Sequence, residues 1–162
     1  MDLQKLVSVL LVGIFILVPN MGTKICDNGM AYSFLRTLTH GTTSHLLFNL
    51  GSFSNISEVL TALMGRTTYA LVLGLIWMLD VIADYLLGQN GLKGCSIGFS
   101  GVVFGLVTFL YFLNQNSLKT VIYNVFLLMA PGFFSPRISN RGHLIGAING
   151  AIVYYLMKFT MF

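Results

Sequence analysis

The chain has 162 residues, of which 56% are hydrophobic and only 9% are charged. A soluble domain usually carries about 25% charged residues, so this composition argues against a soluble domain and indicates a membrane protein. The formal net charge of +4 is spread thinly and forms no basic patch, which argues against nucleic-acid binding. The two cysteines are too few and too far apart to suggest a structural zinc site.

Six apolar segments follow one another, at residues 3–18, 44–64, 67–87, 98–114, 118–134 and 142–159. We expect each to be a helix, because backbone groups in lipid must be paired internally and no segment alternates like a barrel strand. The first segment lacks the cleavage site of a signal peptide, so a retained helix is favoured. The expected fold is all-α: a polytopic membrane protein with six transmembrane helices, and one membrane-embedded domain over residues 1–162.

A polar stretch at residues 20–44 separates the first two apolar segments. It is too polar to span a membrane and too long for a simple turn. Charge does not fix the orientation of the expected spans, because nearly equal numbers of cations fall on the two sides. With the amino terminus inside, the inner side carries Lys5, Arg66, Lys119 and Lys158, and the outer side Lys24, Arg36, Lys93, Arg137 and Arg141.

A serine between two glycines opens the fourth apolar segment, in the sequence Gly98-Phe99-Ser100-Gly101. Free N–H groups and the positive end of the dipole at a helix start stabilise developing negative charge. The two glycines permit a tight turn and close approach of a substrate. Because Val102 follows Gly101, this is not the G-x-S-x-G elbow of soluble hydrolases, and a small-residue helix contact is the alternative reading.

A histidine, His143, lies at the start of the sixth apolar segment and can act as general base toward a serine. It is followed by Gly146 and Gly150 on one helix face, and the fourth segment offers Gly101 and Gly105 at the same spacing. Such small faces let two helices approach closely, which would bring Ser100 near His143. No carboxylate neighbours His143 in the sequence, so a dyad is favoured over a Ser-His-Asp triad.

Two further polar residues, His45 and Asn49, lie one helical turn apart in the second apolar segment. Both side chains can donate hydrogen bonds, which suits an oxyanion site, while ordinary interhelical hydrogen bonds are the alternative. His40, just before them, is expected to shape the loop. Together these sites suggest catalysis inside a membrane, because polar groups at membrane depth are costly.

Three segments in this order and spacing resemble the rhomboid intramembrane proteases, over nearly the whole chain. They are His40-Gly41-Thr42-Thr43-Ser44-His45-Leu46-Leu47-Phe48-Asn49, then Gly98-Phe99-Ser100-Gly101 with Phe104-Gly105, then Gly142-His143 with Gly146 and Gly150.

The resemblance implies a serine endopeptidase that cleaves transmembrane helices of single-pass membrane proteins in the lipid bilayer, without metal or cofactor. Ser100 would be the nucleophile and His143 the base, with an oxyanion and substrate-binding site from the Ser100 N–H, His45, Asn49 and Gly98. Residues 20–44 would be the partly embedded first loop of the family.

The chain departs from the family pattern in this loop. Rhomboids commonly carry Trp-Arg eight or nine residues before the loop histidine, where this chain has Ala31-Tyr32, and Arg36 lies closer to the histidine. The glutamate often found near the end of the second helix is out of register, since Glu58 comes early.

Two rival functions remain open at this point. One is a non-catalytic rhomboid-like protein that binds transmembrane helices. The other is a small proton-coupled transporter using Asp80 and Asp84, although these carboxylates are expected to point into the bundle or toward the loop, with Lys93 as a partner. Cys26 and Cys95 fall on the same side of the membrane as the dyad, and unpaired thiols are favoured over a disulfide between them.

Overall fold

The computed structural model describes residues 2–18, 29–88, 97–134 and 139–161, and these residues form seven helices and no strand. The helices are α1 (Leu3–Leu17), α2 (Met30–Leu38), α3 (Thr43–Met64), α4 (Arg66–Gly88), α5 (Ser100–Leu113), α6 (Leu118–Phe134) and α7 (Asn140–Met161). The all-helical prediction is therefore confirmed. Six helices coincide with the six apolar segments, and α2 is an additional short helix in the polar stretch that was expected to be the partly embedded first loop.

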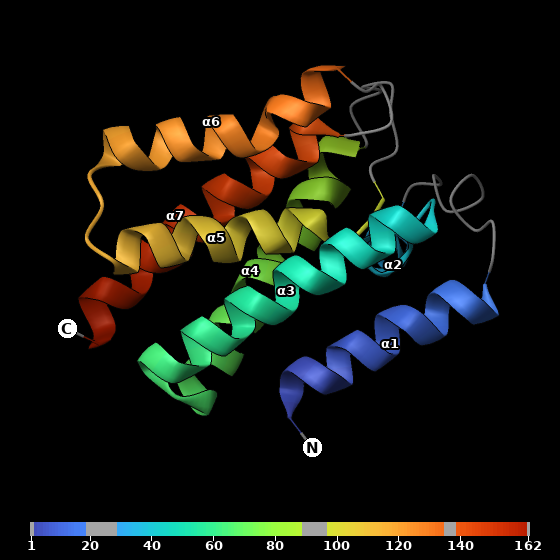
Figure 1. The fold of residues 1–162 in the computed structure, drawn as a ribbon, viewed down its shortest axis with the longest axis horizontal. Helices are drawn as coiled ribbons and strands as arrows, with labels where there is room; N and C mark the ends of the chain where they lie inside the picture. The colour runs from blue at the N-terminus through green and yellow to red at the C-terminus, as the bar shows by residue number, and fades with distance from the viewer. Residues whose placement is uncertain (1, 19–28, 89–96, 135–138, 162) are drawn as a thin grey trace.

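Four helices, α3, α4, α5 and α7, form the centre of the bundle, and two others flank it on opposite sides (Figure 1). The first helix, α1, packs against α3 and α2, whereas α6 packs against α5 and α7. The short helix α2 lies against α4 and near the start of α5. The beginnings of α5 and α7 therefore meet the α2–α3 connection at one end of the bundle.

The helix ends that shape this end of the bundle have identifiable causes. The helix α3 begins where the Thr42 hydroxyl accepts a hydrogen bond of 3.1 Å from the N–H of His45, a cap that contributes about 1 kcal/mol. The helix α7 begins in the same way, with the Ser139 hydroxyl accepting from the N–H of Gly142 at 3.2 Å. Both caps fix the first turns that carry His45 and His143.

The closest helix pair is α5 with α7, and glycines make the contact. A Cβ atom on Gly146 would overlap the backbone of Gly101, and one on Gly150 would overlap the backbone of Gly105. Both pairs are offset by the same number of residues, so the two helices run parallel in a fixed register. The structure thus brings together the four glycines whose spacing suggested a shared face.

Apolar residues fill the space between α3, α4 and α5. Phe53, Ile76 and Leu106, one from each helix, are fully buried, and the ring of Phe99 meets that of Phe53 edge-on at 5.2 Å. A second cluster joins α6 to α5 and α7. Lipid is as apolar as these side chains, so close packing rather than water exclusion must hold such helices together in a membrane.

Among the described residues, α4 has a segment both long and apolar enough to cross a membrane by itself, Arg66–Leu87. The helices α1, α5 and α6 are apolar but shorter. The count of six spans therefore stays a prediction.

We predict that Gly150→Val lowers the free energy of unfolding by about 1–3 kcal/mol, because the branched side chain would overlap the backbone of Gly105. Equilibrium unfolding in mixed detergent micelles measures this effect. The matched control is Gly74→Val in α4, where a Cβ meets nothing within 4 Å. Equal losses in the two variants would show that the α5–α7 contact does not require glycine.

Candidate active site

Ser100 is the first residue of α5 and is partly buried. The turn before it is held by two hydrogen bonds, both donated by backbone N–H groups. The N–H of Gly98 donates to the carbonyl of Arg36 at 2.8 Å, and the N–H of Phe99 donates to Nε2 of His40 at 3.4 Å. The first N–H groups of a helix lack partners within it, so the start of α5 offers donors at Ser100.

His143 lies in the first turn of α7, and its side chain is 8% exposed. Its ring stacks on the ring of Phe104, with centroids 4.1 Å apart and planes inclined by 10°. Phe104 follows Ser100 by four residues and so shares its face of α5. The imidazole is therefore held against the helix face that carries Ser100.

No hydrogen bond joins Ser100 to His143 within the described ranges, and Nδ1 of His143 has no hydrogen-bond partner there. The Ser100 and His143 side chains thus lie at the same end of the bundle and at the same face of α5, but they are not hydrogen-bonded to each other. Hydrogen bonds between catalytic groups are often formed only when a substrate is bound.

His45 and Asn49 of α3 face the turn that precedes Ser100. A Cβ atom on Gly98 would lie 2.6 Å from Cε1 and 2.8 Å from Nε2 of His45, and 3.6 Å from Nδ2 of Asn49. The φ of Gly98 is +113°, a conformation that suits glycine. Asn49 is 5% exposed, and its Nδ2 donor has no partner among the described residues, so it is available to an incoming oxygen.

His40 is buried beside this turn, and its ring meets that of His45 edge-on at 5.1 Å. Burial, with a smaller contribution from the neighbouring His45, lowers the pKa of His40 to about 4. The ring is therefore neutral at physiological pH, and its Nε2 is free to accept from the N–H of Phe99. This geometry is that of a loop-shaping residue.

The two carboxylates of α4 are engaged in different ways. Asp84 accepts hydrogen bonds from Nε and Nη2 of Arg36, at 2.9 and 2.6 Å. Asp80 is buried over Gly101, with its oxygen atoms 2.5 and 2.8 Å from where a Cβ would stand, and Asn149 of α7 lies beside it. Lys93, the partner expected from sequence, lies outside the described residues.

The remaining predictions about special residues concern cysteines and metals. Cys26 and Cys95 both lie outside the described residues, so the preference for unpaired thiols stays a prediction. Within the described part of the chain, no group of three or more potential metal ligands occurs.

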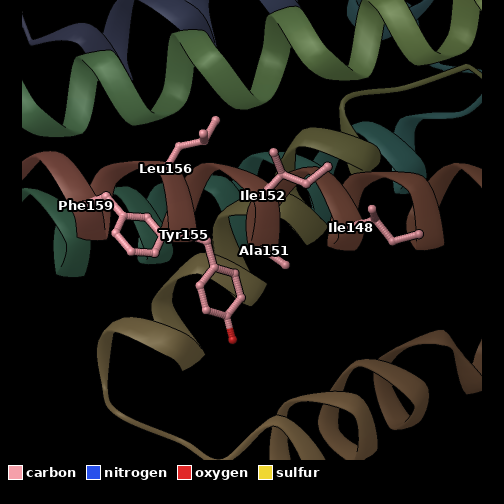
Figure 2. A pocket seen from close by; sticks show the side chains of 6 residues that line it. All are labelled: Ile148, Ala151, Ile152, Tyr155, Leu156 and Phe159. Carbon is pink, nitrogen blue, oxygen red and sulfur yellow. The ribbon is translucent and has the colours of Figure 1, made fainter.

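An open apolar groove of about 390 Å³ lies along α7, and neither Ser100 nor His143 lines it (Figure 2). Aliphatic and aromatic side chains line it, and the hydroxyl of Tyr155 is the only side-chain oxygen or nitrogen they carry. The lining residues are Ile148, Ala151, Ile152, Tyr155, Leu156 and Phe159.

Comparison with known proteins identifies the family to which this chain belongs. The model of the rhomboid domain matches residues 28–159. A protein of Acanthamoeba polyphaga mimivirus that carries the provisional name rhomboid protein L523 is 34% identical over 131 residues, covering 78% of this chain and 74% of the viral protein. The chain belongs to the rhomboid family. Because rhomboids are embedded in membranes and α4 suits a membrane span, this rhomboid is a membrane protein.

Sequence reasoning missed two contacts around the candidate site of this rhomboid. The stacking of Phe104 on His143 was not foreseen, although Phe104 belongs to the segment that resembles the family. The pairing of Arg36 with Asp84 was also missed. A signal was present for it, since a carboxylate in an apolar helix requires a partner and Arg36 is a cation in the polar stretch at residues 20–44.

We predict that Gly98→Ala slows labelling of Ser100 by a serine-directed fluorophosphonate at least about 10-fold. The new Cβ would press on the ring of His45 and shift the turn before Ser100, and small displacements of reacting groups are costly. The matched control is Gly65→Ala, also at a positive φ, +80°, but with nothing within 4 Å. Equal slowing in both variants would assign the effect to backbone strain alone.

Proposed function

We propose that this rhomboid is an intramembrane serine endopeptidase that hydrolyses peptide bonds in the transmembrane helices of membrane proteins. The observation that carries the proposal is the stacking of His143 on Phe104, which holds a potential base on the face of α5 that begins with Ser100. In this proposal α1, α3, α4, α5, α6 and α7 are the six spans of a multi-pass protein.

The proposed reaction begins with attack of Ser100 Oγ on the scissile carbonyl carbon while His143 takes the hydroxyl proton. The carbonyl electron pair moves onto its oxygen, which the N–H of Ser100 and the donors of His45 and Asn49 stabilise. The tetrahedral intermediate then collapses. The C–N bond breaks, and His143 returns the proton to the departing amine.

The second half of the reaction releases the acyl group from Ser100. His143 takes a proton from a water molecule, which attacks the ester carbon, and then returns that proton to Oγ as the C–O bond breaks. The free enzyme is restored, and the sequence of steps consumes one water per bond cut. Every proton transfer is assigned to His143, so the proposal uses neither a metal nor a cofactor.

The proposed substrates are single-pass membrane proteins whose helix unwinds near the membrane surface and enters between helices of the enzyme. An extended backbone is needed, because a carbonyl within a regular helix is shielded by its own hydrogen bonds and side chains. By analogy with the family, a small residue at the cut site is favoured.

A non-catalytic rhomboid that binds transmembrane helices without cutting them is the second candidate. The observation in its favour is the lack of a hydrogen bond between Ser100 and His143 within the described residues. The transporter reading loses support, since Asp84 is paired with Arg36 and Asp80 is packed over Gly101. The dyad variants below separate cutting from binding alone.

We predict that Ser100→Ala and His143→Ala each abolish cleavage of a transmembrane substrate by purified protein in detergent. The double variant should be no worse than either single variant, since members of a catalytic unit are strongly non-additive. Gel-based quantification of the cleavage product measures this. Cleavage at the wild-type rate by Ser100→Ala would refute the protease proposal, and substrate binding without cleavage by the wild type would favour the non-catalytic alternative.

We also predict that Asn49→Ala lowers kcat by up to about 10²-fold with little change in KM, because an oxyanion donor acts mainly in the transition state and other donors remain. Steady-state cleavage kinetics separate the two constants. Asn55→Ala is the matched control, since Asn55 is exposed on the same helix. A raised KM with unchanged kcat in Asn49→Ala would contradict the oxyanion role.

A further inference from the structure

The short helix α2 is tied to α4 by a charged pair at the end of the bundle that carries the candidate site. Nε and Nη2 of Arg36 donate to Oδ2 of Asp84 at 2.9 and 2.6 Å, and Nη2 also donates to the hydroxyl of Ser33 at 2.7 Å. The Arg36 side chain is 7% exposed and that of Asp84 27%. Charge-assisted hydrogen bonds of this length, largely removed from water, are among the stronger ones in proteins.

Two further contacts fasten α2 to the same face of α4, and both involve Trp77. Its Nε1 donates to the hydroxyl of Thr37 at 2.8 Å, and its ring stacks on that of Phe34 with centroids 5.4 Å apart. The indole also meets the ring of Phe99 edge-on at 5.2 Å. Trp77 therefore contacts both α2 and the residue that immediately precedes Ser100.

Arg36 joins the charged pair to the turn before the nucleophile. Its side chain holds Asp84, and its backbone carbonyl accepts the hydrogen bond of 2.8 Å from the N–H of Gly98. Gly98 stands two residues before Ser100. The position of the Arg36 backbone, set on one side by Asp84, thus sets the position of the turn on the other side.

We propose that the Arg36–Asp84 pair is a positioning clamp, which holds α2 against α4 so that the Arg36 carbonyl fixes the Gly98–Ser100 turn for reaction. This inference rests on the proposed function for its kinetic readout and has a structural readout of its own. Neither residue touches the substrate or the reacting atoms in this scheme. Their effect on rate passes through the placement of Ser100, where a displacement of about 1 Å can cost about 10²-fold.

The test compares Asp84→Asn, Arg36→Gln and the double variant with the wild type. Arg36→Gln keeps the backbone carbonyl and removes the charged partner of Asp84 together with the donor to the Ser33 hydroxyl, and it serves where loss of Asp84 prevents folding. The matched control is Glu58→Gln, which removes an exposed carboxylate from α3. Each clamp variant should lower kcat about 10-fold with KM unchanged, and the double variant should match the single variants because the pair acts as one unit.

Amide hydrogen exchange at Gly98 supplies the readout that needs no proteolysis. Protection of this amide should fall at least about 10-fold in each clamp variant, while the core of α5 and α7 stays protected. Wild-type Gly98 protection in folded Arg36→Gln and Asp84→Asn overturns the clamp, as does an additive loss of kcat in the double variant. If the wild type cleaves nothing, the proposed function fails, and loss of Gly98 protection in the variants still supports the clamp.

Discussion

The close contact between α5 and α7 is the constraint on which the candidate site depends. The backbones of Gly101 and Gly105 lie where any side chain on Gly146 or Gly150 would have to be. In lipid, burial of apolar surface gives little driving force for helix association, so the free energy of this contact comes from dispersion and backbone proximity. Dispersion weakens steeply as the two backbones move apart. The register of the two helices is therefore narrowly defined.

The register of α5 and α7 determines which residues lie close together where the two helices begin. Ser100 begins α5, and His143 is in the first turn of α7, so a parallel contact anchored by glycines places both near the same end. The α2–α3 connection closes this end from another side, with His45 over Gly98 and His40 accepting from Phe99. The polar groups of the candidate site thus gather at this end of the bundle, while apolar residues fill most of the space between the helices.

Much of this architecture could be predicted from the sequence. Lipid restricts the backbone to helices, and each membrane helix is visible in the sequence as a long apolar segment. The family, confirmed by comparison, was recognisable from short segments around His45, Ser100 and His143. The short helix α2 was not predictable, since its nine residues are polar in part and owe their order to α4. The Arg36–Asp84 pair joins residues 48 positions apart, so the sequence signals that Asp84 needs a partner but not which cation supplies it.

In the proposed mechanism, the stacking of His143 on Phe104 has a consequence for how a base without a carboxylate partner works. The flat hydrocarbon face fixes the plane of the imidazole, which leaves its edge to exchange protons and restricts the ring to motion within that plane. When the imidazole becomes a cation, the negative face of the phenyl ring attracts it, and such an attraction is worth up to about 2 kcal/mol where water is scarce. An aromatic ring would then serve both purposes for which soluble serine proteases use an aspartate: alignment of the base and stabilisation of its charged form.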